Sequence, residues 1–347
     1  MKQPWAWVIW LAAVLVMLTI TRNPLYLMII LLCVVLVWLA LRAKGASLAQ
    51  SFSWWKFAGW IILLATGFNM LTSHFGETVL FIIPGKIPLI SGNITVEAMV
   101  YGATNGLILT GMLASFTVLN LALPMRDLIS LIPRAFFPIA VVTSIAVSYL
   151  PTTLRQFRQI REAQEVRGHH MRTLGDWLPL LMPLLVGGLE HAMQLAEAMT
   201  ARGFASTRTA SSKRSIYPRV LMLAGVTLMI AGWLMQLGLA GGEGWILIVS
   251  GFMLTLIGLW WLGKGSQRTV YHRRVWSWQD GLVIAGTLAA VIAMFAPMPG
   301  VGKEIFYYDP YPVIQMPGFS LRIGLAILAL IVPGVLKLFT RQANHSS

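Results

Sequence analysis

The sequence predicts an all-α, polytopic membrane protein with about eight transmembrane helices and long cytoplasmic helices between two sets of spans. Three observations predict this fold. The chain of 347 residues is 57% hydrophobic and only 11% charged, a composition that differs strongly from that of a soluble domain. Apolar runs of about 20 residues, the length needed to cross ~30 Å of hydrocarbon, recur along the chain. A polar, basic region interrupts these runs near the middle.

Eight apolar runs are expected to cross the bilayer, four before the polar region and four after it. They cover about 5–21, 25–41, 57–72, 98–120, 218–239, 244–262, 280–297 and 320–340. The expected organisation is therefore N-terminal transmembrane helices in 1–120, a cytoplasmic or interfacial region in 121–217, and C-terminal transmembrane helices in 218–347. The first run is interpreted as a retained span, because no small-residue cleavage site precedes the turn at Arg22-Asn23-Pro24.

The net charge of +14 is distributed as membrane topology requires, which argues against a nucleic-acid partner. With the N-terminus inside, the outer loops and flanks hold only Arg22, Lys86, Lys303 and Arg322. The other 22 of the 26 Lys and Arg residues lie inside or at inner ends of spans, in agreement with the positive-inside rule. We therefore expect a multi-pass protein of the cell membrane with both termini in the cytoplasm and basic segments beside anionic lipid.

Two apolar stretches inside the polar region, 128–150 and 177–189, have two possible placements. Prolines interrupt both stretches, and both continue directly into charged helix, which favours helices that lie at the inner surface or dip partly into the bilayer. A pair of fully crossing helices is the alternative, and hydropathy leaves it open. On the outer side, residues 78–96 are rich in turn residues and are expected to form a loop or a re-entrant element.

The polar region is expected to contain two long charged helices with similar ends. The first covers about 139–167 with a kink near Pro151, and the second runs from a cap at Asp176 to about Arg202. Glycine readily ends a helix, and the helix dipole favours a cation at the C-terminus. The two ends read Val166-Arg167-Gly168 and Ala201-Arg202-Gly203, and the supporting residues before them are Glu162, Ala163, Gln164 and Glu197.

These helix ends have an ordinary and a functional interpretation. The ordinary one is a pair of capped helices with basic ends beside lipid headgroups. The functional one is docking, because an Arg guanidinium presents a planar fork of donors to an acidic or carbonyl partner. A helix that ends in Gly also adds little side-chain bulk to a groove. Two such ends suit two similar partner sites, such as those of a dimeric motor.

The paired motif resembles that of the transmembrane T component of energy-coupling factor (ECF) transporters, the family that includes the cobalt and biotin T proteins. Members carry two Ala-Arg-Gly-type motifs at the ends of long cytoplasmic coupling helices. Ala201-Arg202-Gly203 matches fully, whereas Val166-Arg167-Gly168 has Val in place of Ala. The resemblance covers about residues 1–240 and leaves the role of the later spans open. Two further segments are similar to family segments: Leu123-Pro124-Met125-Arg126-Asp127-Leu128, which has one residue more than the family's Pro-x-Asp-Leu, and Leu150-Pro151 leading into Arg161-Glu162-Ala163-Gln164.

The resemblance implies a scaffold that is not an enzyme and that works with several partners. Two cytoplasmic ATPase subunits would bind ATP and Mg and would receive the helix ends at Arg167 and Arg202, so no cofactor is expected in this chain. A small membrane protein, the S component, would bind the substrate, a vitamin or a metal ion. Closure of the ATPases would move the coupling helices and reorient the S component. The ATPase-coupling residues implied are Val166, Arg167, Gly168, Ala201, Arg202 and Gly203.

Other patterns in the chain give no support for a catalytic or metal site. The segment 258–264 imitates a phosphate loop, but Gly265 stands where Ser or Thr should bind magnesium, and no strand precedes it. His169-His170 have no carboxylate or cysteine at zinc spacing. Two alternative functions remain: a self-contained secondary transporter, which would need ionisable residues within spans and inverted repeats, and a membrane-embedded enzyme, which would need a convergent catalytic set.

Overall fold

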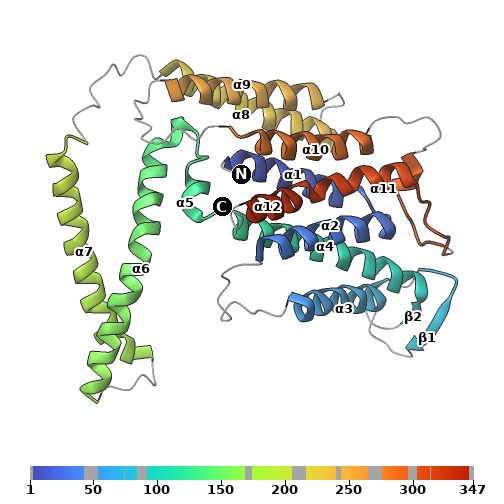
Figure 1. The fold of residues 1–347 in the computed structure, drawn as a ribbon, viewed down its shortest axis with the longest axis horizontal. Helices are drawn as coiled ribbons and strands as arrows, with labels where there is room; N and C mark the ends of the chain where they lie inside the picture. Colours follow the sequence, from blue (N-terminus) through green and yellow to red (C-terminus); the bar gives the residue numbers. More distant parts are fainter. Residues whose placement is uncertain are drawn as a thin grey trace. The chain divides into compact units, whose positions relative to one another are not determined.

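A computed structural model describes residues 3–42, 54–73, 75–83, 92–168, 174–204, 216–239, 244–264, 276–295, 303–312 and 314–343 (Figure 1). Helices make up most of these residues, which confirms the all-α expectation. The chain divides into two compact units, Met1–Pro124 with His272–Ser347, and Met125–Tyr271. The division of the sequence into 1–120, 121–217 and 218–347 concerns membrane topology and stays a prediction.

The first unit is a helical bundle built from both ends of the chain. Its helices lie within a few residues of the predicted spans. The last span differs, because a short 3₁₀ segment, Leu328–Ile331, separates its two α-helices. The helices of this unit are α1 Pro4–Ile20, α2 Pro24–Arg42, α3 Trp54–Thr72, α4 Val96–Ala122, α10 Trp278–Phe295, α11 Leu321–Ile327 and α12 Val332–Ala343.

Buried polar contacts join the two chain ends within this unit. The Trp10 indole N–H donates to the carbonyl of Leu330 at 3.1 Å. The Asn23 amide donates to two carbonyls of the C-terminal segment, those of Ile305 and Gly318, each at 2.8 Å. Each contact satisfies a polar group that would otherwise be buried without a partner, which costs about 1–3 kcal/mol. The C-terminal helices are therefore an integral part of the bundle, with α10 against α1 and α12 against α2.

The outer segment at 78–96 differs from the expected loop or re-entrant element, because it contains an antiparallel hairpin. Strand β1 Val79–Ile83 pairs with β2 Gly92–Thr95. The run Val-Leu-Phe-Ile-Ile combines β-branched and aromatic residues, which favour strands. Thr95 then caps α4 by accepting a hydrogen bond from the Ala98 N–H at 3.3 Å. In the first turn of α4, the buried Glu97 carboxylate accepts hydrogen bonds from the N–H and hydroxyl of Thr78.

The second unit contains the two long charged helices and a further helical hairpin. Its helices are α5 Met125–Ile129, α6 Phe137–Val166, α7 Leu178–Ala201, α8 Ile216–Leu234 and α9 Gly244–Lys264. Asp176 was predicted to cap the second charged helix, and this was wrong. It lies inside a 3₁₀ turn, Leu174–Trp177, and Trp177 occupies the N-cap position without a side-chain hydrogen bond. The chain enters α7 directly from this 3₁₀ turn. Pro179, in the first turn of α7, already fixes the backbone there.

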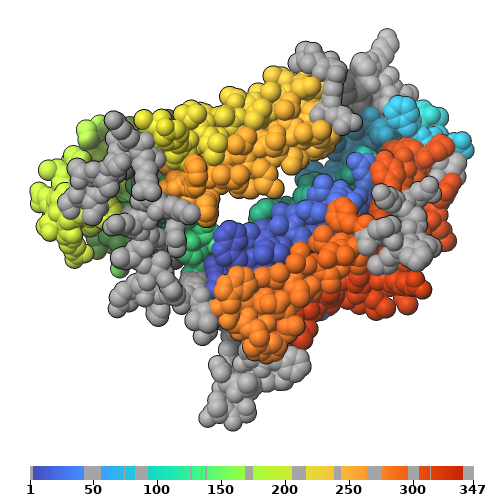
Figure 2. All heavy atoms as spheres, turned by 90° about the horizontal axis from the view of Figure 1, so that it is seen from above, coloured from blue at the N-terminus to red at the C-terminus, as the bar shows by residue number. Residues whose placement is uncertain are grey.

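Helices α8 and α9 pack along each other (Figure 2), and their backbones are in close contact. A Cβ atom added at Gly225 would lie 2.7 Å from the carbonyl oxygen of Gly251. One added at Gly232 would lie 2.7 Å from the carbonyl oxygen of Gly244. A step of seven residues forward along α8, from Gly225 to Gly232, corresponds to a step of seven residues back along α9, from Gly251 to Gly244, as an antiparallel pair requires. Small residues at such an interface allow the close helix contacts that stabilise helix pairs in membranes.

Seven helices of the described chain are long and apolar enough to cross a membrane. One of them, Gly175–Ala201, includes α7, so its length and composition also permit the crossing placement that hydropathy left open. Two predicted spans correspond to shorter apolar stretches, Pro4–Ile20 in α1 and Lys56–Thr72 within α3. The chain is thus a multi-pass membrane protein, and the placement of α7 stays a prediction.

Candidate coupling site

The first candidate helix end is the C-terminus of α6. Arg167 is the C-cap residue, and its backbone N–H donates to Gln164 O at 3.1 Å. Gly168 follows with φ +78° and donates to Glu165 O at 3.0 Å. This left-handed conformation suits glycine because it has no Cβ. The predicted helix end is therefore confirmed, and it presents Val166 with 89% of its surface exposed.

The second candidate helix end, at the C-terminus of α7, has the same form. Arg202 is the C-cap, and Gly203 has φ +72°. The N–H of Gly203 donates to Thr200 O at 2.9 Å, and the N–H of Phe204 donates to Met199 O at 3.0 Å. These two bonds form a complete Schellman motif, which uses two of the carbonyls that the helix end would leave free. Phe204 was missed as part of this cap because sequence spacing does not show which way the chain turns after Gly203.

The two helices form an antiparallel pair that aromatic contacts hold together. Tyr149 of α6 stacks on His191 of α7, with ring centroids 4.6 Å apart and an interplanar angle of 8°. Phe157 of α6 stacks on Trp177 at the entry to α7, at 6.3 Å. His191 is exposed, and its ring also contributes to the helix contact.

The antiparallel pairing places the two Arg-Gly ends at opposite ends of the pair (Figure 1). From the stacked rings, α6 continues 18 residues to Arg167, and α7 continues 11 residues to Arg202 in the other direction. At ~1.5 Å per residue these lengths correspond to a separation of roughly 40 Å between the two ends. The structure therefore separates the two matching motifs instead of joining them into one site.

The charged side chains near the first end are exposed to solvent. Arg161 and Glu165 make an i,i+4 ion pair at 2.8 Å, and both side chains are about half exposed. Glu162, Ala163 and Arg167 are exposed as well, so the last two turns of α6 offer a polar, accessible surface. At the α7 end, Glu197, Ala201 and Arg202 are likewise exposed. Each end places a cation at the negative pole of its helix, where the helix dipole favours a positive charge.

Two other predicted features can be placed. The segment that imitates a phosphate loop is helical to Lys264 as part of α9, and Gly258 lies against Met222 of α8. Its backbone N–H groups therefore belong to the helix and are not arranged around an anion. His169 and His170 lie outside the described residues. Within the described ranges, no group of three or more His, Cys, Asp or Glu residues could hold a metal ion.

Comparison with known proteins places this geometry in a family. The EcfT transmembrane protein of Bacillus selenitireducens is 26% identical over 220 residues, which cover 58% of this chain and 78% of that protein. The EcfT protein of Heliobacterium modesticaldum is 29% identical over 192 residues, covering 50% and 71%. The EcfT protein of Leuconostoc gelidum is 32% identical over 104 residues, which cover 25% of this chain and only 39% of that relative.

The family comparison covers the N-terminal bundle helices and both Arg-Gly ends. The family CbiQ, described as cobalt transport protein, matches residues 2–213, which is more than half of the chain. The match ends before α8 and therefore leaves α8 to α12 outside it. The resemblance stated from the two motifs is confirmed, and the chain belongs to the CbiQ cobalt transport protein family.

Proposed function

We propose that this chain is the transmembrane component of an energy-coupling factor transporter. It is a membrane scaffold without catalytic activity of its own, and both termini lie in the cytoplasm. Two cytoplasmic ATPase subunits bind ATP and Mg, and a small membrane S component binds the vitamin or metal ion that is taken up. The names of the EcfT relatives support the transporter assignment. The positive-inside charge distribution supports the orientation.

One observation carries the mechanism: the two Arg-Gly helix ends lie at opposite ends of one antiparallel pair. The ends have the same capping geometry, so they suit two similar grooves. Their separation of roughly 40 Å prevents both from entering one groove and favours one ATPase subunit for each end. When the two subunits approach each other during ATP binding, they push the ends of α6 and α7 together, and the pair transmits this displacement to the membrane and the S component.

Arg167 and Arg202 have the leading role in each contact. Each guanidinium can donate several hydrogen bonds to carboxylates or carbonyls of an ATPase groove, and charge-assisted bonds contribute about 1.5–3 kcal/mol each. Gly168 and Gly203 end the helices without adding side-chain bulk of their own. Val166 and Ala201 precede the arginines and pack against the groove wall, while Glu162, Ala163, Gln164 and Glu197 form the helix surface behind them.

The test is co-purification of the ATPase subunits with the double variant Arg167→Glu/Arg202→Glu. We expect at least a tenfold loss of bound ATPase, because a loss of 1.4 kcal/mol at either end already has that effect. Arg155→Glu is the matched control, since Arg155 is also an exposed arginine of α6 but lies three turns before the end. Normal ATPase binding by the double variant, with the chain correctly inserted in the membrane, would contradict the proposal.

A further inference from the structure

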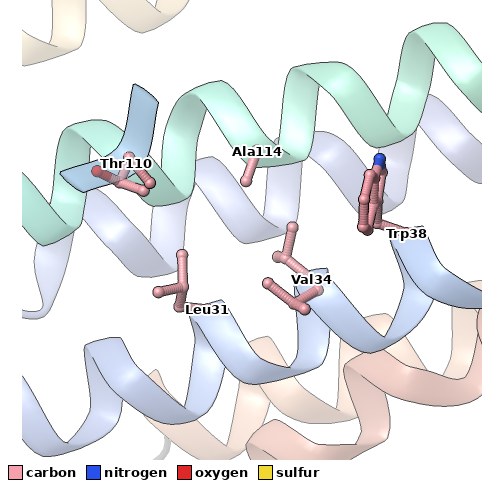
Figure 3. A pocket seen from close by; sticks show the side chains of 7 residues that line it. Leu31, Val34, Trp38, Thr110 and Ala114 are labelled. Carbon is pink, nitrogen blue, oxygen red and sulfur yellow. The ribbon is translucent and has the colours of Figure 1, made fainter. Parts of the chain in front are cut away.

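A narrow apolar groove lies in the first unit, on α4 between α2 and α3 (Figure 3). It exists because α2 and α3 both pack on α4, whereas direct contacts between α2 and α3 are sparse in the described residues. Small side chains at Ala58 and Ala114 leave the space between the three helices unfilled. The other walls are Leu31, Val34, Val35 and Trp38 from α2 and Thr110 from α4.

The groove and the cation beyond it together extend over about one leaflet of a bilayer. The groove follows α2 from Leu31 to Trp38, a helix rise of about 10 Å, and Arg42 stands one turn further along the same helix. From Leu31 to Arg42 the helix rises about 16 Å. This is about half of the ~30 Å hydrocarbon thickness, which is the depth that the acyl chain of one lipid reaches. With Arg42 at one headgroup layer, the groove therefore lies within a single leaflet.

The headgroup end of the groove is positively charged. The Arg42 guanidinium lies over the Trp38 ring, 4.7 Å from its centroid, and Trp38 itself lines the groove. Lys56, an exposed residue in the first turn of α3, comes two positions before the groove residue Ala58. No carboxylate among the described residues forms an ion pair with Arg42 or Lys56. Two unpaired cations at the headgroup end of an apolar groove are complementary to an anionic phosphate that carries a hydrocarbon chain.

We propose that this groove is a binding site for an anionic phospholipid. One acyl chain occupies the groove from Trp38 to Leu31, and the phosphate lies between Arg42 and Lys56. The cation–π contact with Trp38 orients Arg42 toward the headgroup, and the aromatic ring itself sits at the membrane interface, where Trp is favoured. The bound lipid fills the space between α2 and α3 and so completes the packing of α4.

Thr110 provides a test of the chemistry of the occupant. It lies at the deep end of the groove and is 3% exposed, and its hydroxyl has no hydrogen-bond partner within the described structure. A hydrocarbon chain cannot hydrogen-bond to this hydroxyl, so Thr110→Val, which keeps the shape of the side chain, leaves lipid binding unchanged. A ligand with a polar group at this depth would bind to the hydroxyl and would be lost from the same variant.

The experiment uses the full chain in nanodiscs of phosphatidylcholine that contain a phosphatidylglycerol with a photoreactive diazirine in its acyl chain. Mass spectrometry after illumination then locates the labelled residues. We expect the labels to concentrate on the groove residues of α2, α3 and α4. Ala58→Phe fills the half-buried rim of the groove and is expected to lower this labelling about tenfold. Ala12→Phe, an exposed alanine on α1, is the matched control and is expected to have no effect.

A second variant leaves the groove intact and tests the charged end. Arg42→Gln/Lys56→Gln is expected to remove the preference for phosphatidylglycerol over phosphatidylcholine, a change of about tenfold or more for two interfacial cations. Equal labelling of all exposed apolar helix faces, unchanged by Ala58→Phe or by the charge variant, would overturn the proposal. Loss of labelling in Thr110→Val would also overturn it, because the binding of a hydrocarbon chain does not depend on the hydroxyl.

Discussion

The two antiparallel helix pairs of the second unit, α6–α7 and α8–α9, are held together in different ways. In α8–α9, glycines bring the backbones so close that an added Cβ would collide with the partner helix. In α6–α7, the contacts are side-chain contacts between aromatic rings, and glycines of α7 such as Gly187 and Gly188 have open space around them. The backbones are therefore in direct contact in α8–α9, whereas the ring contacts of α6–α7 involve side chains. The comparison contrasts a hairpin held by close backbone packing with a pair held by side-chain contacts.

The family comparison also separates the two pairs. The α6–α7 pair lies inside the segment that matches the CbiQ family, whereas the α8–α9 pair lies outside it. The α6–α7 pair carries the two Arg-Gly ends. Both pairs carry exposed apolar side chains, such as Leu185 of α7 and Trp233 of α8, which suit a lipid environment.

The largest expected effect is a difference in thermal stability when one glycine is replaced by alanine in each of the two pairs. Gly251→Ala places a Cβ 2.6 Å from the carbonyl oxygen of Gly225, and such overpacking costs about 1–3 kcal/mol. Gly187→Ala meets nothing within 4 Å and is expected to stabilise α7 by roughly 0.5–1 kcal/mol. Thermal unfolding in detergent at a fixed scan rate measures both. The two apparent midpoints should shift in opposite directions, and equal shifts would contradict the comparison.

A smaller effect is expected at the helix ends. Gly168→Ala forces a residue with a Cβ into φ +78°. The added Cβ meets no atom within 4 Å, so the helix end is destabilised only by the unfavourable backbone conformation, by about 1–2 kcal/mol. Hydrogen exchange should show faster exchange, by about tenfold, confined to the last turn of α6. Gly168→Asn should exchange almost normally, because Asn tolerates the left-handed region. An Ala variant that exchanged like the original chain would show that the glycine conformation is not required.

The smallest effect is expected for the ion pair of α6. Arg161 and Glu165 are about half exposed, and exposed i,i+4 pairs contribute only about 0.3–0.5 kcal/mol. Arg before Glu is also the less favourable order along a helix. Glu165→Gln should therefore leave the unfolding midpoint unchanged within error at physiological salt. A shift of several degrees would mean that this surface takes part in a larger charge network.

The sequence was sufficient for local features and insufficient for contacts between distant segments. Apolar runs predicted the spans, and Gly168 and Gly203 predicted the two helix ends, because both signals depend on adjacent residues. The Asp176 cap was wrong because a 3₁₀ turn competes with capping there. The hairpin at 79–95 was missed because its strands are short and follow each other among turn residues.

The glycine spacing of α8 and α9 was a signal that could have been found. Gly225 and Gly232 are seven residues apart, as are Gly244, Gly251 and Gly258, and a seven-residue repeat of small residues marks a helix seam. The packing of α10 and α12 against α1 and α2, and the stacking of Tyr149 on His191, carry no comparable local pattern. They depend on segments that are far apart in the chain or on opposite helices.

The measurement that tests the central claim most directly is site-specific photocrosslinking from both helix ends. A photoreactive residue is placed at Val166, at Ala201 or at both, and the chain is co-expressed with its ATPase subunits. Each single probe should capture one ATPase subunit, and the double probe should capture two in one covalent product, because the ends lie roughly 40 Å apart. A double-probe product that never exceeds one ATPase subunit, or no ATPase product from either end, would contradict the account of α6–α7 as a coupling pair.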